Sequence, residues 1–206
     1  LISDRSIEIG AAVALEVGKN RLESLGDVEE TADLIRYYCD QIEANNGFVK
    51  PAGQESPKHH NTSVLKPYGV WVVISPFNFP FALAGGPTGG PLVPGNTVVF
   101  KPASDTPCIA LELTRVLLDA GIPPAVITTV TGRARDIADA LVDNSEVDAI
   151  TFTGSTVVGL NLQKQVAGRN LRVQTEMGGK NASIVLEDAD LDLAADTIAA
   201  ASFSVM

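Results

Sequence analysis

The sequence is poor in the residues that most often indicate a metal site, a disulfide framework or a nucleic-acid surface. Only two of its 206 residues are cysteines, and Cys39 and Cys108 match no metal-binding or redox spacing. Lysine and arginine together number 15 against 25 acidic residues, which gives a net charge of −10 and little to neutralise a phosphate backbone. We therefore expect no nucleic-acid partner, and we expect reduced, buried thiols in a cytoplasmic protein.

Long hydrophobic runs are also missing. No stretch approaches the roughly 20 apolar residues that a membrane-spanning helix needs, and no basic segment precedes an apolar one as in a secretory signal. His59 and His60 are adjacent and have no third ligand nearby, so no metal site is expected. With 45% hydrophobic residues, 19% charged residues and a mean hydropathy of +0.17, the composition indicates a soluble globular protein without a membrane partner.

Both ends of the sequence suggest a partial chain. Leu1 is not an initiator methionine, and the helix-like stretch 191–206 stops without the glycine or asparagine that commonly ends a helix. We therefore expect the 206 residues to be a fragment of a longer protein.

Two helices, 6–21 and 28–44, are expected at the start of the chain because apolar residues recur there at helical spacing. In the first, Ile7, Ala11 and Leu15 form the predicted apolar stripe, and the charged residues are interpreted as solvated faces. The proline-containing segment 47–67 is then expected to be an extended connection or a protruding hairpin.

From residue 67 onward, short apolar runs alternate with helical segments, and continuous apolar runs are typical of strands buried on both faces. Strands are expected at 69–75, 97–101, 125–130, 148–153, 171–175 and 182–186. Helices are expected at 79–92, 107–119, 134–143, 155–166 and 191–203. This alternation predicts an α/β fold, an open parallel sheet with helices on both faces.

Ligands of such sheets bind beyond the carboxyl ends of the strands, so the residues at those ends are the candidates for function. After the first strand, Asn78 stands between two prolines, either as a helix cap or as a fixed amide that stabilises an oxyanion. After the second, Lys101 and Ser104 are either ligands of ribose hydroxyls or a phosphate, or a solvated lysine and a turn serine.

Polar groups also follow the later strands. Gly132 follows the third strand, and Gly154 and Ser155 stand at a helix N-terminus, where anions bind readily. Glu176 ends the fifth strand and precedes Gly178-Gly179, and it is either a general base or a surface acid. The convergence of these strand ends favours one shared ligand site.

Standard nucleotide-binding patterns do not occur at these places. No Gly-x-Gly-x-x-Gly follows the first strand, and the glycines of 85–90 fall inside a helix, where we expect them to allow close helix–sheet packing. Gly179-Lys180 does not form a P-loop, because Asn181 replaces the required serine or threonine and Gln174 the first glycine.

Four motifs nevertheless resemble the aldehyde dehydrogenase superfamily in order and spacing, over essentially the whole chain. They are Pro-Phe-Asn-Phe-Pro at 76–80, Gly-Asn-Thr-Val-Val-Phe-Lys-Pro-Ala at 95–103, Phe-Thr-Gly-Ser at 152–155 and Glu-Met-Gly-Gly-Lys at 176–180. Within the superfamily, the segment 37–42, Lys-Pro-Ala-Ser and Glu-Met-Gly-Gly-Lys look most like the branch that contains 1-pyrroline-5-carboxylate dehydrogenase.

The resemblance implies a Rossmann-like cofactor domain and oxidation of an aldehyde, with glutamate semialdehyde as a candidate, to a carboxylic acid with NAD or NADP through a cysteine thiohemiacetal. It assigns the oxyanion to Asn78 and the role of base to Glu176. It implies that Lys101 and Ser104 bind the adenosine ribose of the cofactor. Gly132 would lie under the adenine, and Ser155 would bind the pyrophosphate. The full set of cofactor-binding residues that it implies is Phe77, Lys101, Ser104, Gly132, Phe152, Gly154, Ser155 and Met177.

The chain departs from the family pattern in two respects. The nucleophilic cysteine is expected just beyond Met206, so the chain alone is expected to bind cofactor without turning over an aldehyde. Ala134 and Ala138 replace further glycines after Gly132, which predicts a less close approach of that helix to the adenine end. Ser104, where many NAD-preferring members carry glutamate, leads us to expect that NADP is tolerated alongside NAD, with Arg133 and Arg135 as candidate phosphate partners.

The resemblance also implies a domain organisation and a homo-oligomer, either dimer or tetramer. The expected parts are N-terminal helices of the cofactor-binding domain at 1–48, an oligomerisation hairpin at 49–66, the NAD(P)-binding domain at 67–178 and an incomplete catalytic domain at 179–206. Two alternatives stay open. One is a non-catalytic nucleotide-binding or assembly module derived from the same fold. The other is a reductase of acyl phosphates or thioesters, which Glu176 disfavours.

Overall fold

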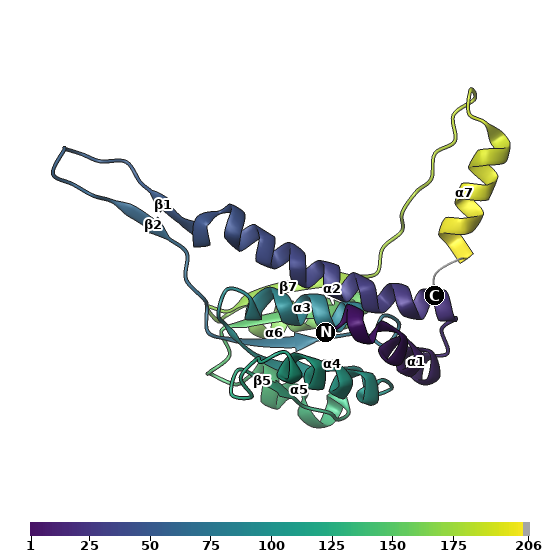
Figure 1. Ribbon diagram of the computed structural model, residues 1–206, viewed down its shortest axis with the longest axis horizontal. Coiled ribbons are helices and arrows are strands. Elements are labelled where there is room, and N and C mark those ends of the chain that lie inside the picture. Colours follow the sequence, from purple (N-terminus) through teal and green to yellow (C-terminus); the bar gives the residue numbers. More distant parts are fainter. Residues whose placement is uncertain (204–206) are drawn as a thin grey trace.

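The predicted α/β architecture is confirmed by the computed structural model, which describes residues 1–203 (Figure 1). Five strands form a parallel sheet in the order β5-β4-β3-β6-β7. Their bounds are Val70–Ile74 for β3, Thr97–Lys101 for β4, Ile127–Thr129 for β5, Ala149–Gly154 for β6 and Arg172–Met177 for β7. The connecting helices are Ala82–Leu92 for α3, Pro107–Asp119 for α4, Ala134–Val142 for α5 and Thr156–Val166 for α6.

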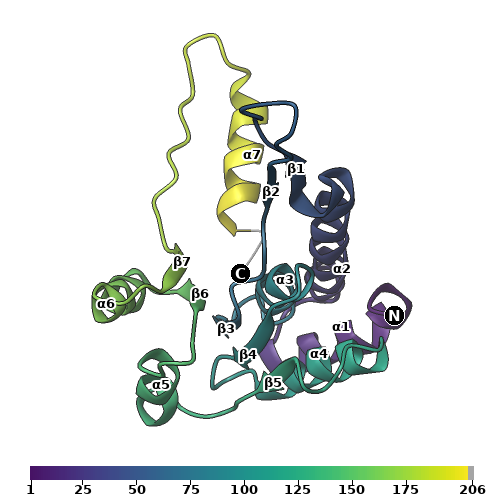
Figure 2. The ribbon, with the colours of Figure 1, turned by 90° about the vertical axis from the view of Figure 1, so that its left-hand side faces the viewer.

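Two further helices, α1 at Ser6–Val17 and α2 at Arg21–Ala44, precede the sheet. Seen end-on, α1, α2, α3 and α4 lie on one side of the sheet, and α5 and α6 lie on the other (Figure 2). Side chains alternate along a strand, so both faces of the central strands must be apolar. On β3, Val73 joins the core cluster that contains Phe81 and Phe100, and Val72 joins the cluster that contains Ile150 and Phe152.

The apolar stripe of α1 that we expected to be buried is exposed. The prediction for this stripe is therefore wrong. Ile7 is 80% exposed and Leu15 is 89% exposed, whereas the buried face carries Ile9, Gly10 and Val13. Both stripes have helical spacing, and the choice between them is made by packing. The two helices approach closely at Gly10, where a Cβ would lie 3.1 Å from Leu25 of α2 and the leucine side chain would have to move slightly.

Helix α2 begins at Arg21 rather than at Val28, because the Asn20 side chain accepts a hydrogen bond from the Glu23 N–H at 2.9 Å and caps the helix. It ends as predicted, where Asn46 and Gly47 take up positive φ angles.

The glycines of α3 pack against α2 and not against the sheet, which corrects the prediction for them. Cβ atoms at Gly86 and Gly89 would lie 2.6 Å from Leu34 Cδ1 and 2.7 Å from Ile35 Cγ1. A larger residue at either position would therefore have to displace a side chain of α2 where the two helices cross closely. Leu34, Ile35 and Tyr38 belong to the surface of α2 that meets α3.

Two segments extend away from the body of the molecule (Figure 1). One is an antiparallel hairpin of β1, Val49–Pro51, and β2, Thr62–Val64, whose residues are all exposed. The other runs from β7 to α7, Leu191–Phe203, which buries none of its residues. The strand expected at 182–186 does not form, because no neighbouring strand among residues 1–203 pairs with it. The predicted end of the last helix at 204–206 lies outside the described residues.

Both cysteines are free thiols. Both are exposed, so the prediction that they are buried is wrong. Cys39 follows Tyr38, whose ring faces Gly90 of α3, so the next position along α2 turns away from that contact. Cys108 lies in the first turn of α4, where its backbone N–H donates to Glu16. Within residues 1–203, none of the helices combines the length and hydropathy required to cross a bilayer.

Candidate active site

The candidate residues lie along one edge of the sheet, where the carboxyl ends of the parallel strands meet. Ile74 at the end of β3 pairs with Lys101 of β4 and Phe152 of β6, and Thr153 of β6 pairs with Glu176 of β7. The segments that follow these strands therefore leave the sheet at the same edge.

The amide of Asn78 is free. Asn78 lies in the bend between β3 and α3, beside the 56% exposed Phe77, and its side chain forms no hydrogen bond within residues 1–203. It does not cap α3, because the N–H of Ala82 is bonded by the carboxylate of Asp27 at 2.7 Å. This geometry disfavours the helix-cap alternative and leaves the amide available to a ligand.

Lys101 is buried at the end of β4 with only 4% of its surface exposed. Its ammonium donates to the carbonyl oxygen of Pro102 at 2.9 Å, the one acceptor it has among residues 1–203. Burial lowers the pKa of this amine. An ammonium has three N–H donors, so two donors of Lys101 have no acceptor among residues 1–203. Buried donors without an acceptor are unfavourable. Ribose hydroxyls would supply the missing acceptors, and the residue fits a nucleotide cofactor.

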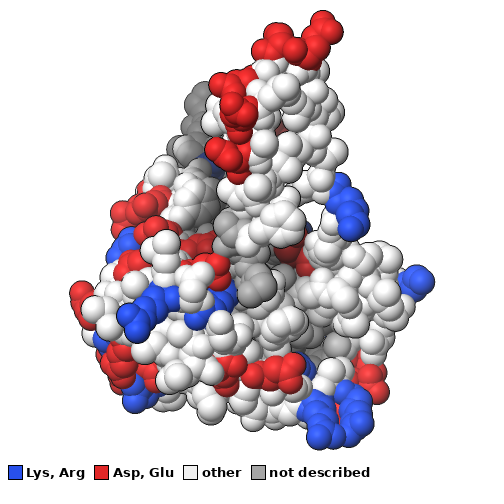
Figure 3. Space-filling model, turned by 90° about the vertical axis from the view of Figure 1, so that its right-hand side faces the viewer, with Lys and Arg blue, Asp and Glu red and all other residues white. Residues whose placement is uncertain are grey.

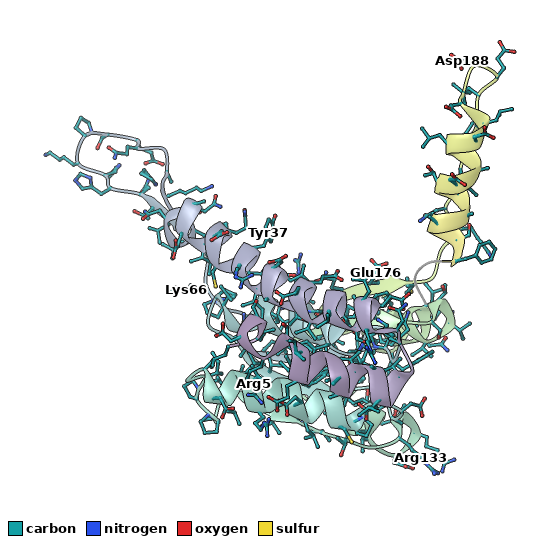
Figure 4. All side chains as sticks on the ribbon, turned by 45° about the vertical axis from the view of Figure 1, so that its right-hand side comes forward. Arg5, Tyr37, Lys66, Arg133, Glu176 and Asp188 are labelled. Atoms are coloured by element: carbon teal, nitrogen blue, oxygen red, sulfur yellow. The ribbon has the colours of Figure 1, made fainter. Side chains whose placement is uncertain are left out.

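The loops after β4 and β5 are joined by a hydrogen bond from the Ser104 hydroxyl to the carbonyl oxygen of Gly132 at 3.2 Å. Gly132 has a φ of 153°, and a Cβ at this position would lie 3.3 Å from Ile137 Cδ1. The guanidinium groups of Arg133 and Arg135 are exposed at the start of α5, and Figure 4 shows Arg133 pointing outward there. Arg135 also lies 3.6 Å from the Asp136 carboxylate.

The start of α6 offers unpaired backbone donors. Ser155 is its N-cap and accepts from the N–H of Val158 at 3.4 Å, and the first helical bond joins the N–H of Gly159 to the Ser155 carbonyl. The amides of residues 156 and 157 precede that bond, and such amides attract anions such as a pyrophosphate.

Phe152, Gly154 and Met177 shape this helix start from beneath. Phe152 is 6% exposed, and Cβ atoms at Gly154 and Gly159 would lie 2.7 Å from its ring and 2.5 Å from Met177 Sδ, respectively. These residues therefore set how closely α6 approaches the ends of β6 and β7. They act through packing, since Phe152 offers almost no surface to a ligand.

Glu176 stands on the opposite face of the sheet from Lys101. Along β7 the side chains of Val173, Thr175 and Met177 are partly buried, whereas Glu176 belongs to the exposed set. Its carboxylate forms no hydrogen bond or ion pair with the described part of the chain. Figure 4 shows Glu176 where the chain leaves the sheet toward α7. A free carboxylate at a strand end has the availability that a general base requires.

The sequence did not indicate two other features of this edge. Val157 and Val158 are 70% and 52% exposed in the first turn of α6, and adjacent apolar residues directly after Gly-Ser-Thr were the available signal. Lys19 was assigned to a solvated face, but it is buried with Asp27 behind the Asn78 loop.

A cavity of about 890 Å³ lies away from this edge, between the hairpin, α2 and α3, with Tyr38, Trp71 and Arg172 among its lining residues. On the face shown in Figure 3, acidic and basic side chains are interspersed, without a continuous basic area among the described residues. Residues 1–203 bring no three His, Cys, Asp or Glu side chains together in a way that could hold a metal ion.

A comparison with protein families gives one match over the whole chain, in which residues 1–206 match the aldehyde dehydrogenase family. The chain belongs to the aldehyde dehydrogenase family. It is 41% identical over 210 residues to the 1-pyrroline-5-carboxylate dehydrogenase of Staphylococcus saprophyticus, and 40% identical to that of Staphylococcus aureus. In both comparisons 98% of the chain is covered, but it spans only 40% of the relative's length.

Solved structures of aldehyde dehydrogenases share the fold. The NADP-dependent glyceraldehyde-3-phosphate dehydrogenase of Bacillus halodurans C-125, complexed with NADP, superposes with a TM-score of 0.90 at 37% identity over 98% of this chain and 43% of that one. An NAD-dependent aldehyde dehydrogenase of Sinorhizobium meliloti gives 0.90 at 35% identity over 97% and 39%. The resemblance that the four motifs predicted is thereby confirmed, including its 1-pyrroline-5-carboxylate dehydrogenase-like character.

Proposed function

We propose that this chain supplies the cofactor-binding part and the general base of an enzyme that oxidises an aldehyde to a carboxylic acid with NAD or NADP. The observation that carries the proposal is the set of free groups at one sheet edge. Among residues 1–203 these are the amide of Asn78 and the carboxylate of Glu176, both without a partner, and the buried ammonium of Lys101 with a single acceptor.

In this proposal the two sides of the edge have different tasks. Lys101 and the α6 N-terminus hold the ribose and pyrophosphate of the cofactor, which supplies the hydride acceptor when bound. Asn78 donates an N–H to the oxyanion that forms when a thiolate attacks the aldehyde carbon. Glu176 accepts a proton from the attacking thiol or from the water that releases the acid. The thiol is provided from outside these 206 residues, since Cys39 lies on α2 and Cys108 lies on α4, where its backbone N–H is bonded to Glu16 of α1.

Glutamate semialdehyde is the substrate we propose. The support is the 41% identity to a 1-pyrroline-5-carboxylate dehydrogenase, since that relative's name denotes the cyclic form of this aldehyde. The test is an assay of the full-length protein across a panel of semialdehydes and simple aldehydes with both cofactors, followed by the absorbance of the reduced nicotinamide. We expect glutamate semialdehyde to give the highest kcat/KM. Cofactor binding without turnover of any aldehyde would instead favour a non-catalytic module.

We also propose that the protein is a cytoplasmic homo-oligomer, with 49–66 as the contact between subunits. The support is the exposed hairpin of β1 and β2, whose unpaired edges are suited to pairing with another chain. The domains proposed remain those predicted from the resemblance: 1–48 and 67–178 for the cofactor, and 179–206 for the start of a catalytic domain.

Replacing Ser104 with glutamate is expected to weaken NADP binding by about tenfold or more, roughly 1.4 kcal/mol, and to leave NAD binding nearly unchanged. Ser104 is exposed and bonded to the Gly132 carbonyl, so a carboxylate there meets a 2′-phosphate at close range and repels it. The measurement is titration of the full-length protein with each cofactor. Ser104→Gln is the control, because it has the size of glutamate without the charge. If wild type and Ser104→Glu bind NADP equally poorly, NADP is not tolerated.

A further inference from the structure

Lys19 and Asp27 form a buried ion pair on the side of the Asn78 loop that faces α1 and α2. The side chains are 2% and 0% exposed, and Lys19 Nζ lies 3.4 Å from Asp27 Oδ2. Removing two charges from water is costly, and a buried pair is often no more stabilising than a well-packed apolar pair. We therefore looked at which neighbouring residues the pair contacts.

Both partners of the pair hold residues that flank Asn78. Asp27 Oδ1 accepts the N–H of Ala82, the first residue of α3, at 2.7 Å. Lys19 Nζ lies 3.5 Å from the centroid of the Phe79 ring, within the range of a cation–π interaction. Phe79 is the residue directly after Asn78, so the pair fixes the loop on its C-terminal side.

The loop is fixed at its other end by the sheet. The N–H of Ser75, directly after β3, donates to the carbonyl of Lys101 at 3.2 Å. Between these two anchors, Asn78 itself has no hydrogen-bond partner among the described residues. Its position therefore depends on the anchors rather than on contacts of its own.

Helix α3 supplies no cap of its own. Its N-cap residue, Phe81, has no side chain that can accept a hydrogen bond, so the Asp27 carboxylate takes the place of the cap. A carboxylate at this end also interacts favourably with the helix dipole. Burial raises the pKa of the Asp27 carboxyl, whereas the Ala82 N–H and the Lys19 ammonium oppose that rise.

We propose that Lys19 and Asp27 are positioning residues that hold Asn78 where its amide meets the oxyanion of the reaction, through the Phe79 ring and the first turn of α3. This inference rests on the proposed function, because it assigns the pair to the same reaction. The pair does not touch the reacting atoms. Its removal should therefore lower kcat and leave cofactor affinity unchanged.

The test uses Lys19→Met and Asp27→Ala in the full-length enzyme, each also combined with Asn78→Ala. Each single variant is expected to lower kcat by about tenfold, a part of the 10²–10³-fold that loss of an oxyanion donor costs. In the Asn78→Ala background, the same changes should cause almost no further loss of kcat. The effects of substitutions that act through one group are not additive. The Kd of NAD or NADP should stay within about twofold of wild type.

The matched control is the exposed ion pair Asp33–Arg36 on α2, the helix that carries Asp27, with a distance of 2.8 Å. Asp33→Asn and Arg36→Met should leave kcat unchanged. The proposal is overturned if Lys19→Met and Asp27→Ala lower kcat equally with and without Asn78, because the pair would then act on the whole protein rather than on the loop. Asp27→Asn keeps an acceptor for the Ala82 N–H and should restore part of the loss.

A second measurement separates this inference from the proposed function. In hydrogen exchange, Asp27→Ala should accelerate the exchange of the Ala82 amide far more than that of Ile150 in the central strand β6. Equal acceleration at both amides overturns the inference. Absence of turnover by the wild-type enzyme would sink the proposed function alone, and the exchange result would still decide whether the pair holds the loop.

Discussion

Replacing Glu176 with glutamine is expected to lower kcat of the full-length enzyme by about 10²–10⁴-fold, the usual contribution of a general base. Glutamine has the shape of glutamate but does not accept the proton from a thiol or from water. The carboxylate is exposed and has no partner among residues 1–203, so the substitution breaks no bond of the fold. The melting temperature and the Kd of the cofactor should therefore stay the same while kcat falls.

The control for this experiment is Glu30→Gln. Glu30 is also exposed and unpaired in the described structure, but it lies on α2, away from the strand ends. Glu30→Gln should leave kcat unchanged, because Glu30 is remote from the candidate site. It should also change the free energy of unfolding by no more than about 0.5 kcal/mol, as is usual for surface substitutions. A Glu176→Gln enzyme with wild-type kcat would remove Glu176 from the proposed chemistry. A variant that unfolds more readily would show that the carboxylate has a structural role.

The sheet, and the edge that carries the candidate residues, could be predicted because their signals are local. Runs such as 69–75 are apolar on both faces, and each is followed by residues that regular structure rarely tolerates, such as the Pro-Phe-Asn-Phe-Pro bend. In a parallel sheet, knowing that Lys101 and Glu176 end strands is enough to place both at one edge. The structure adds that they lie on opposite faces of the sheet there.

The predictions that were wrong depend on contacts between distant segments. The two stripes of α1 have the same spacing, so periodicity could not show that Ile9 rather than Ile7 would be buried. The run 182–186 has the composition of a strand, but a strand needs a neighbour, and none pairs with it among residues 1–203. Lys19 was assigned to solvent because charge usually is, but it is buried beside Asp27, whose carboxylate binds the start of α3.

Replacing Phe100 with alanine is expected to lower the free energy of unfolding by about 3–5 kcal/mol, the usual cost of truncating a buried phenylalanine. Phe100 is 0% exposed and belongs to the core cluster on the side of the sheet covered by α1 to α4. It also lies on β4 directly before Lys101, whose side chain alternates to the other face of the strand. The loss should therefore appear in stability rather than in the Lys101 ammonium, which we propose binds the cofactor.

Urea unfolding of the full-length protein measures this effect, with Leu111→Ala as the matched control. Leu111 lies on α4, which covers the same face of the sheet, but it is 52% exposed. Its truncation leaves no enclosed cavity, so the expected change is within about 0.5 kcal/mol. Below the unfolding midpoint, Phe100→Ala should still bind NAD or NADP, because Lys101 keeps its strand and its acceptor. Equal losses from the two variants would contradict the assignment of Phe100 to the core, since burial is the property in which they differ.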